Sequence, residues 1–163
     1  MKPTPEQKRL AVHHVVYEYA NLLSTGTRLL ETGLDALKPP DNTHVQDAFL
    51  LSCRKMAEFF KMQRARQYVI GYDYVRRSTV TFTLSEWAKW SEAADRHVTH
   101  ISYTRLENVT EWNGTANRPL LEEFRTAWCD FYNAIDERFK AEFERQIDEK
   151  VTCEGFGRLD LRS

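Results

Sequence analysis

Apolar side chains recur at helical spacing through most of the chain, and the longest such stripe runs towards its C-terminal end. It starts near Asn117, advances by three or four residues at a time, and comprises Leu120, Phe124, Trp128, Phe131, Ile135, Phe139, Phe143 and Ile147. Residues at these steps gather on one face of an α-helix, where they can be buried together. We therefore expect one long helix over about 117–151 and an all-α fold that includes it.

A first helix is expected to begin at Pro5. Thr4 and Gln7 stand at the spacing of a capping box, in which each side chain accepts one free backbone N–H of the first turn. Proline is favoured at the first helical position. The apolar stripe that follows consists of Val12, Val16, Tyr19, Leu23, Leu30, Leu34 and Leu37. Pro39 and Pro40 then end the helix, because proline lacks the N–H that a helix interior needs.

The second and third helices are expected over about 43–62 and after Thr83. Thr43 with Gln46, and Thr83 with Glu86, repeat the capping-box spacing. The third helix would direct inward Trp87, Trp90, Ala94, Val98 and Ile101. Between these two helices the helical period is lost and β-branched and aromatic residues dominate, which predicts an irregular or short β crossover rather than a stable hairpin. The pattern as a whole predicts a four-helix bundle.

Length and charge fit one domain over 1–163. The chain has 163 residues, with 23 basic and 24 acidic side chains and a net charge of −1. A chain of this size can stand on one core without metal or disulfides, and the near-zero charge gives no general attraction to nucleic acid or an anionic membrane. We expect the tail after about residue 151 to fray. The core should include Phe49, Phe59, Trp90, Phe131 and Ile135.

No segment approaches the run of about 20 apolar residues needed to cross a bilayer, and the first residues contain no apolar signal region. We therefore expect no membrane association and a cytoplasmic location. The three cysteines, Cys53, Cys129 and Cys153, form no CxxC pair and no Cys/His set at zinc spacing. We expect free thiols, with Cys53 and Cys129 buried. The sequence also lacks a phosphate-binding glycine loop, a nucleophile elbow and an HExxH pair, so neither a metal site nor a cofactor is expected.

Polar residues beside the apolar stripes of the two middle helices are the remaining candidates for a site. On the second helix, Asp47, Arg54 and Glu58 are separated by seven and four residues and so share one face. On the third helix a denser cluster comprises Asp95, Arg96, His97, His100 and Arg105. Consecutive helices of a bundle are usually neighbours, so the two groups are expected to converge in one groove.

Such a groove could handle a phosphate. His100 would be the general acid or base, and Arg54 or Arg96 the phosphate ligand, because an imidazole exchanges protons near neutral pH and a guanidinium can hold phosphate through two hydrogen bonds. The surrounding binding surface would consist of Asp47, Glu58, Asp95, His97 and Arg105. The alternative is a polar network that fixes the register of the two helices, or a set of surface ion pairs.

Two stretches resemble a group of short bacterial proteins of unknown function. Residues 47–60 have an acid, a Phe-Leu pair, an arginine and an acid-Phe-Phe run in the same register as those proteins. Residues 95–105 are similar to their run N-K-x-V-A-H-L-T-x-x-R. Those proteins in turn look like the HEPN superfamily of helical bundles. Many HEPN proteins are toxin or defence ribonucleases, often dimeric, that use an arginine separated by four to six residues from a histidine.

His100 matches the histidine of that pair, but the position with four residues between holds Asp95, and Arg96 leaves only three. Ser52 stands where the bacterial stretch often has a histidine. The resemblance implies an RNA-associated homodimer that acts as a metal-independent ribonuclease, with RNA and a cognate antitoxin as partners. The competing hypothesis is a non-catalytic interaction or structural bundle. The balanced charge and the arginine–histidine spacing favour the second hypothesis, whereas the density of His and Arg favours the first.

Overall fold

The computed structural model describes residues 3–32, 41–60, 70–75, 80–99, 117–153 and 161–162, without the side chains of 41–43, 95–99 and 151–153. These residues form five α-helices and one short 3₁₀ helix. The elements are α1 (Pro5–Thr32), α2 (Asp41–Phe60), η2 (Gly71–Asp73), α3 (Ser85–Thr99), α5 (Asn117–Asn133) and α6 (Glu137–Cys153). The all-α prediction is confirmed for the described part of the chain.

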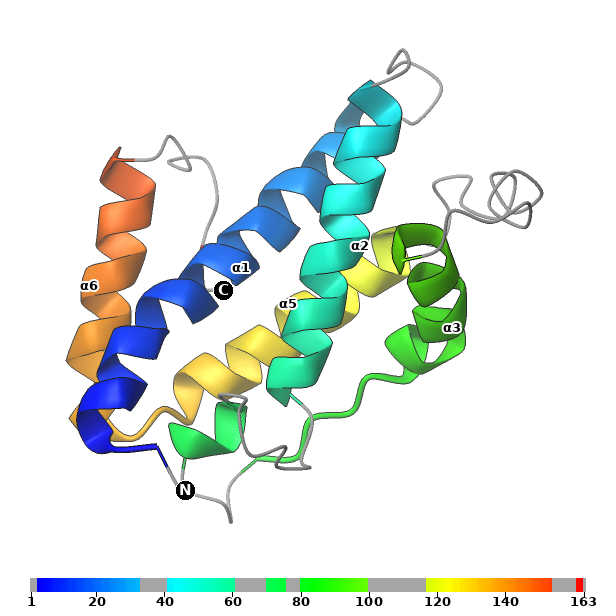
Figure 1. The fold of residues 1–163 in the computed structure, drawn as a ribbon. Helices are drawn as coiled ribbons and strands as arrows, with labels where there is room; N and C mark the ends of the chain where they lie inside the picture. The colour runs from blue at the N-terminus through cyan, green and yellow to red at the C-terminus, as the bar shows by residue number, and fades with distance from the viewer. Residues whose placement is uncertain are drawn as a thin grey trace.

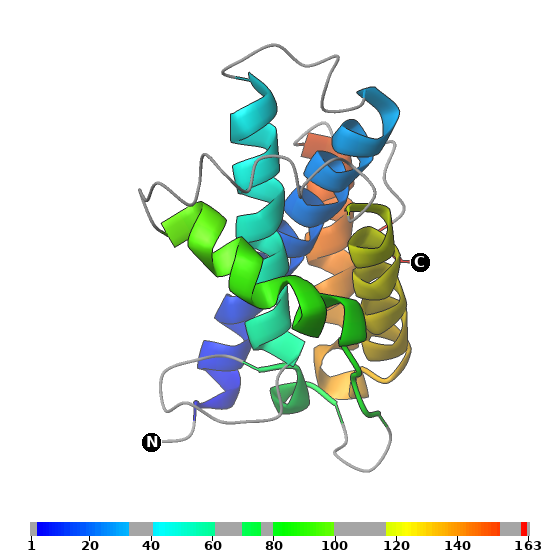
Figure 2. The ribbon, with the colours of Figure 1, turned by 90° about the vertical axis from the view of Figure 1, so that its right-hand side faces the viewer.

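The helices pack around α1 and α2, which lie side by side and share the largest contact of the fold (Figure 1). On its other sides α1 contacts α6 and α5, while α3 contacts α2 and α5. Figure 2 shows α2 to the left of α5, with α3 running across in front, and α2 and α5 also contact each other.

The close packing of α1 on α2 depends on Gly26. A Cβ atom at this position would lie 2.8 Å from Cε2 of Phe49 and 3.0 Å from Cδ1 of Leu121, closer than carbon atoms pack. A glycine here therefore lets the two helices approach. α1 continues past Gly26 to Thr32.

The predicted core is largely confirmed. Phe49, Phe59, Phe131 and Ile135 are buried, and Trp90 is partly buried at its edge. Phe131 is central, because its ring contacts those of Phe59, Phe60, Tyr74, Phe82, Trp128 and Phe143.

The start of α1 follows the predicted capping box. The N–H of Thr4 donates to Oε1 of Gln7 at 2.9 Å, and the N–H of Gln7 donates to Oγ1 of Thr4 at 3.2 Å. The same turn is held to η2, since Nζ of Lys8 lies 3.1 Å from Oδ1 of the buried Asp73.

The other two predicted capping boxes are wrong, because neither threonine is the residue directly before its helix. α2 begins at Asp41, which places Thr43 inside the helix. α3 begins at Ser85, and its free N–H groups are satisfied by Glu123 of α5 rather than by Thr83.

The long last helix is also a wrong prediction, because it is two helices. α5 ends at Asn133 and α6 starts at Glu137. At the break, the N–H of Asp136 donates to the carbonyl of Tyr74 at 2.8 Å, and Ile135 forms an isolated bridge with Val75. Asp136 then caps α6 by accepting the N–H of Arg138 at 3.0 Å. Contacts to the crossover thus replace the helical hydrogen bonds of this turn.

The crossover itself contains η2 and an irregular stretch from Val80 to Leu84. Ile70 is extended and directly precedes η2, and Gly71 and Tyr72 lie within η2, so these residues do not form the strand that a hairpin would need. The described part of the crossover is irregular, which is one of the two forms that the sequence pattern predicted.

Leu161 and Arg162 are the described residues of the segment that follows α6. Leu161 is buried, and its carbonyl accepts the indole N–H of Trp128 at 2.9 Å. Arg162 forms an ion pair with Asp148 of α6. The end of the chain is therefore docked on α5 and α6. Among the helices described here, none combines the length and the apolar character that a membrane span requires.

Candidate functional site

The predicted site residues fall into two groups. Asp47, Arg54 and Glu58 lie on α2, and all three are partly exposed. On α3, the side chains of Asp95, Arg96 and His97 are outside the described residues, as are His100 and Arg105 altogether. The convergence of Arg54 with His100 therefore stays a prediction.

Arg54 and Glu58 line a groove of about 460 Å³ between α1 and α2. α2 contributes one wall with Leu51, Arg54, Lys55, Met56, Glu58 and Phe59, and α1 contributes the other with His14, Val15 and Glu18. The two walls stand opposite each other because α1 and α2 pack along their length. In the described structure, the neighbour across this groove from the predicted α2 residues is α1.

Charge in this groove is balanced. Its basic side chains are Arg54 and Lys55, its acidic ones are Glu18 and Glu58, and His14 adds an imidazole. Nζ of Lys55 lies 2.6 Å from Oε1 of Glu18, which ties the two walls together. Balanced charges leave no strong field of one sign, so the groove resembles a protein-facing surface more than a polyanion channel.

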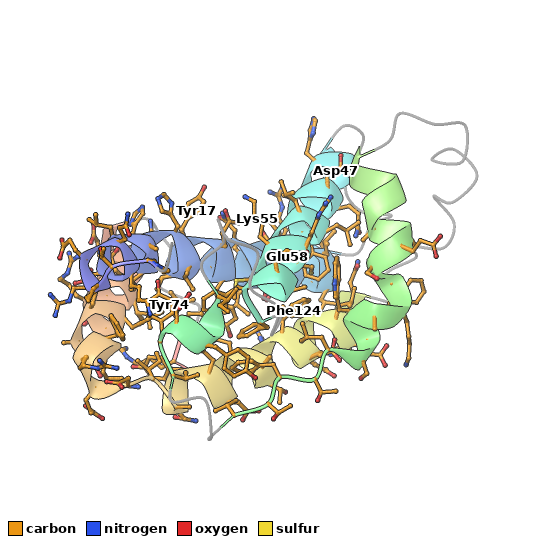
Figure 3. The ribbon with its side chains drawn as sticks, turned by 60° about the horizontal axis from the view of Figure 1, so that its bottom comes forward. Tyr17, Asp47, Lys55, Glu58, Tyr74 and Phe124 are labelled. Atoms are coloured by element: carbon orange, nitrogen blue, oxygen red, sulfur yellow. The ribbon has the colours of Figure 1, made fainter. Side chains whose placement is uncertain are left out.

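Apolar side chains are exposed on the same side of the molecule. Leu10, Tyr17 and Leu51 are 67%, 39% and 40% exposed, and they are the large apolar side chains that the described residues leave open to solvent. All three belong to α1 or α2, and Leu51 also lines the groove. Figure 3 shows Tyr17 and Lys55 projecting from these two helices on the side away from α5. We call this side the α1–α2 surface, defined by Leu10, His14, Tyr17, Leu51 and Arg54.

His14 is a groove residue that sequence reasoning missed. A signal was present: Leu10 and Tyr17, seven residues apart, stand outside the buried stripe of α1, and His14 lies between them. Apolar residues that depart from the core stripe of an amphipathic helix indicate a second face.

A larger hollow of about 660 Å³ lies where α5 meets α6. Its acidic residues are Asp130, Asp136 and Glu137. Asp136 is engaged by the guanidinium of Arg138, with Nε 2.9 Å from Oδ1. The described side chains include no group of three or more His, Cys, Asp or Glu residues placed to hold a metal ion. This hollow is therefore the weaker candidate.

The buried cysteine is not an activated nucleophile. Burial raises the pKa of the Cys53 thiol well above its ordinary value, which suppresses the reactive thiolate. Cys53 and Cys129 are both free, as expected, although Cys129 is partly exposed rather than buried.

A scan of protein-family models found no family that matches this chain, and searches of curated proteins and of solved structures found no match either.

Proposed function

We propose that the protein is a non-catalytic interaction module that binds another polypeptide through the α1–α2 surface. The observation that carries this proposal is the position of Leu10, Tyr17 and Leu51, which leaves exposed apolar area on two adjacent helices. Exposed apolar area beside a polar rim is typical of protein-binding surfaces. The balanced charges around Leu51 fit a partner that also carries both signs.

The proposal keeps the HEPN-like helical architecture that the sequence resemblance implies, and it assigns to the protein the binding role rather than the cleavage role. A cytoplasmic partner protein, such as a cognate antitoxin, or a second copy of the chain would satisfy it. Cleavage of RNA would need an arginine placed to stabilise the charge of the transition state, and the sequence departs from the HEPN spacing at Asp95 and Arg96.

Site-specific photo-crosslinking in cells tests this function. A benzoylphenylalanine at Leu51 should form adducts with a polypeptide, and Arg54→Glu in the same chain should reduce their yield. The control carries the crosslinker at Arg125, an exposed residue of α5 on another side of the molecule. Equal adducts from positions 51 and 125, or none from position 51, would contradict a docking role for this surface.

RNA binding is the second candidate, and the proximity of Arg54, Lys55 and His14 in one groove favours it. A guanidinium and an ammonium can hold phosphates, and an imidazole can transfer protons. Anisotropy of a labelled single-stranded RNA would show this function as affinity that falls with salt and with Arg54→Ala, while Arg125→Ala has no effect. RNA adducts instead of polypeptide adducts at position 51 would favour this candidate.

A further inference from the structure

One face of α2 points outward along most of the helix. It comprises His44, Asp47, Leu51, Arg54 and Glu58, which follow one another at steps of three or four residues and therefore share one side of the helix. Each of these side chains is exposed or partly exposed. Figure 3 shows Asp47 near one end of this face and Glu58 near the other. We call these five residues the outer face of α2.

The charges of the outer face are arranged around Leu51. Asp47 is four residues before Leu51 and Arg54 is three residues after it, which places them about 6 Å and about 4.5 Å away along the helix axis, on opposite sides. Asp47 and Arg54 are seven residues apart and so lie on one stripe of the helix. If a second α2 helix runs in the opposite direction with its Leu51 at the same level, its Arg54 therefore lies at nearly the same level as Asp47 of the first helix.

This order is what a twofold contact between identical helices requires. In such a contact, residue i of one copy meets residue j of the other and j meets i, so the surface must be complementary to itself. Two α2 helices that run antiparallel across Leu51 place Asp47 against the other copy's Arg54, twice. Glu58 then faces the other copy's His44, since both lie seven residues from Leu51, and Leu51 meets its own equivalent.

We propose that the partner of the α1–α2 surface is a second copy of this chain, joined through antiparallel contact of the two outer faces of α2. This proposal rests on the proposed docking function and identifies the partner that binds the α1–α2 surface. The occupant follows from charge complementarity: a parallel pairing of the same faces would place Asp47 against Asp47 and Arg54 against Arg54, at a cost in free energy.

The groove between α1 and α2 adjoins the outer face. Leu51 belongs both to the outer face and to the groove, whose apolar lining includes Val15, Met56 and Phe59. Lys55, on the groove side of Leu51, forms an ion pair with Glu18 of α1. One pair of helices buries a modest area, so the dimer should dissociate on dilution.

Opposite charges introduced at the twofold axis test the proposal. At high concentration, analytical ultracentrifugation of the wild-type chain should give a mass of twice the 19.2 kDa of one chain. Leu51→Glu and Leu51→Lys should each lose the dimer, because like charges would meet at the axis. An equimolar mixture of the two variants should regain it as a heterodimer. Arg125→Glu, which also introduces an acidic side chain at an exposed position but lies on α5, is the control and should stay dimeric.

A second pair of variants tests the ion pairs independently of Leu51 and serves if the Leu51 variants do not fold by circular dichroism. Asp47→Arg and Arg54→Asp should each lose the dimer, whereas the double variant in one chain should recover it. Any of three results would overturn the proposal: a wild type that is monomeric at every concentration, a dimer that these substitutions do not affect, or a mixture of the Leu51 variants that stays monomeric. In those cases polypeptide adducts in cells from position 51 would still support docking of a different protein.

Discussion

The carboxylate of Glu123 on α5 caps α3, with Oε2 accepting the backbone N–H of Trp87 at 2.9 Å. Its Oε1 accepts the N–H of Glu86 at 2.8 Å and the hydroxyl of Ser85 at 3.1 Å. The first N–H groups of α3 have no acceptors within the helix. Because Glu123 of α5 accepts two of them, it also fixes the position of α3 relative to α5.

Replacing this cap should destabilise the protein measurably. Glu123→Ala removes the acceptor for two backbone N–H groups, and we expect the free energy of unfolding to fall by about 1–2 kcal/mol. Urea denaturation followed by circular dichroism would measure the change. Glu122→Ala, an exposed neighbour on the same helix, is the control and should change stability by less than about 0.5 kcal/mol. Equal effects of the two variants would argue against the cap.

Phe131 should be among the most costly residues to truncate. Its side chain is fully buried and contacts six other aromatic rings, so Phe131→Ala would leave a cavity that rigid neighbours cannot fill. We expect a loss of about 3–5 kcal/mol in the free energy of unfolding, measured by denaturant titration. Arg125→Ala on the exposed side of α5 provides the comparison. A loss below about 1 kcal/mol at Phe131 would be inconsistent with the packing of α5.

Stability should decline in alkali partly because of Tyr74. Burial raises the pKa of its phenol, with a further contribution from the charge of Asp73, so the folded protein keeps a proton that the unfolded chain loses above pH 10. The stability tied to this proton is complete below pH 10 and is lost as the pH rises, by at most about 1.4 kcal/mol per pH unit.

The variant Tyr74→Phe isolates this effect. At neutral pH it should be less stable by about 1 kcal/mol, since the phenol donates a hydrogen bond of 2.8 Å to the carbonyl of Lys8. Between pH 9 and pH 11 its stability should fall less steeply than that of the wild type. Denaturant titrations at several pH values would compare the slopes, and parallel slopes would refute the role of Tyr74.

The two described thiols should differ in reactivity. Cys53 is fully buried and burial raises its pKa, whereas Cys129 is partly exposed. In the native protein iodoacetamide at pH 8 should modify Cys129 much faster than Cys53, as peptide mapping by mass spectrometry would show. Unfolding in urea should remove the difference. Native-state rates that are already equal would mean that α2 opens readily around Cys53.

The sequence predicted those parts of the fold that depend on local pattern. The apolar stripe of α1 and the capping box of Thr4 and Gln7 are properties of neighbouring residues, and both are found. The break at Ile135 was not predictable in this way, because the apolar period continues through it without interruption. The break is stabilised by the carbonyl of Tyr74, which is distant in the sequence. The cap of α3 by Glu123 was missed for the same reason.

The candidate site shows the same division. Spacing alone placed Asp47, Arg54 and Glu58 on one face of α2, and all three are partly exposed there. Arg54 and Glu58 face α1 across the groove, which spacing within α2 cannot specify, since it depends on how the helices pack. The packing of Leu161 was not predictable either. Its carbonyl accepts the indole N–H of Trp128, a buried donor that needs an acceptor, and the two residues are distant in the sequence.

Distances between spin labels test the antiparallel pairing of α2 most directly. Labels would be placed one at a time at Ala48, His44 and Arg125, which are all exposed, in a chain whose Cys129 and Cys153 are replaced by serine. A twofold axis at Leu51 separates two copies of residue 48 by about 9 Å along the helix, and two copies of residue 44 by about 21 Å. The account predicts that interlabel distances increase from position 48 to 44 to 125. Equal distances at 48 and 44, or no dipolar coupling at any of the three positions, would contradict it.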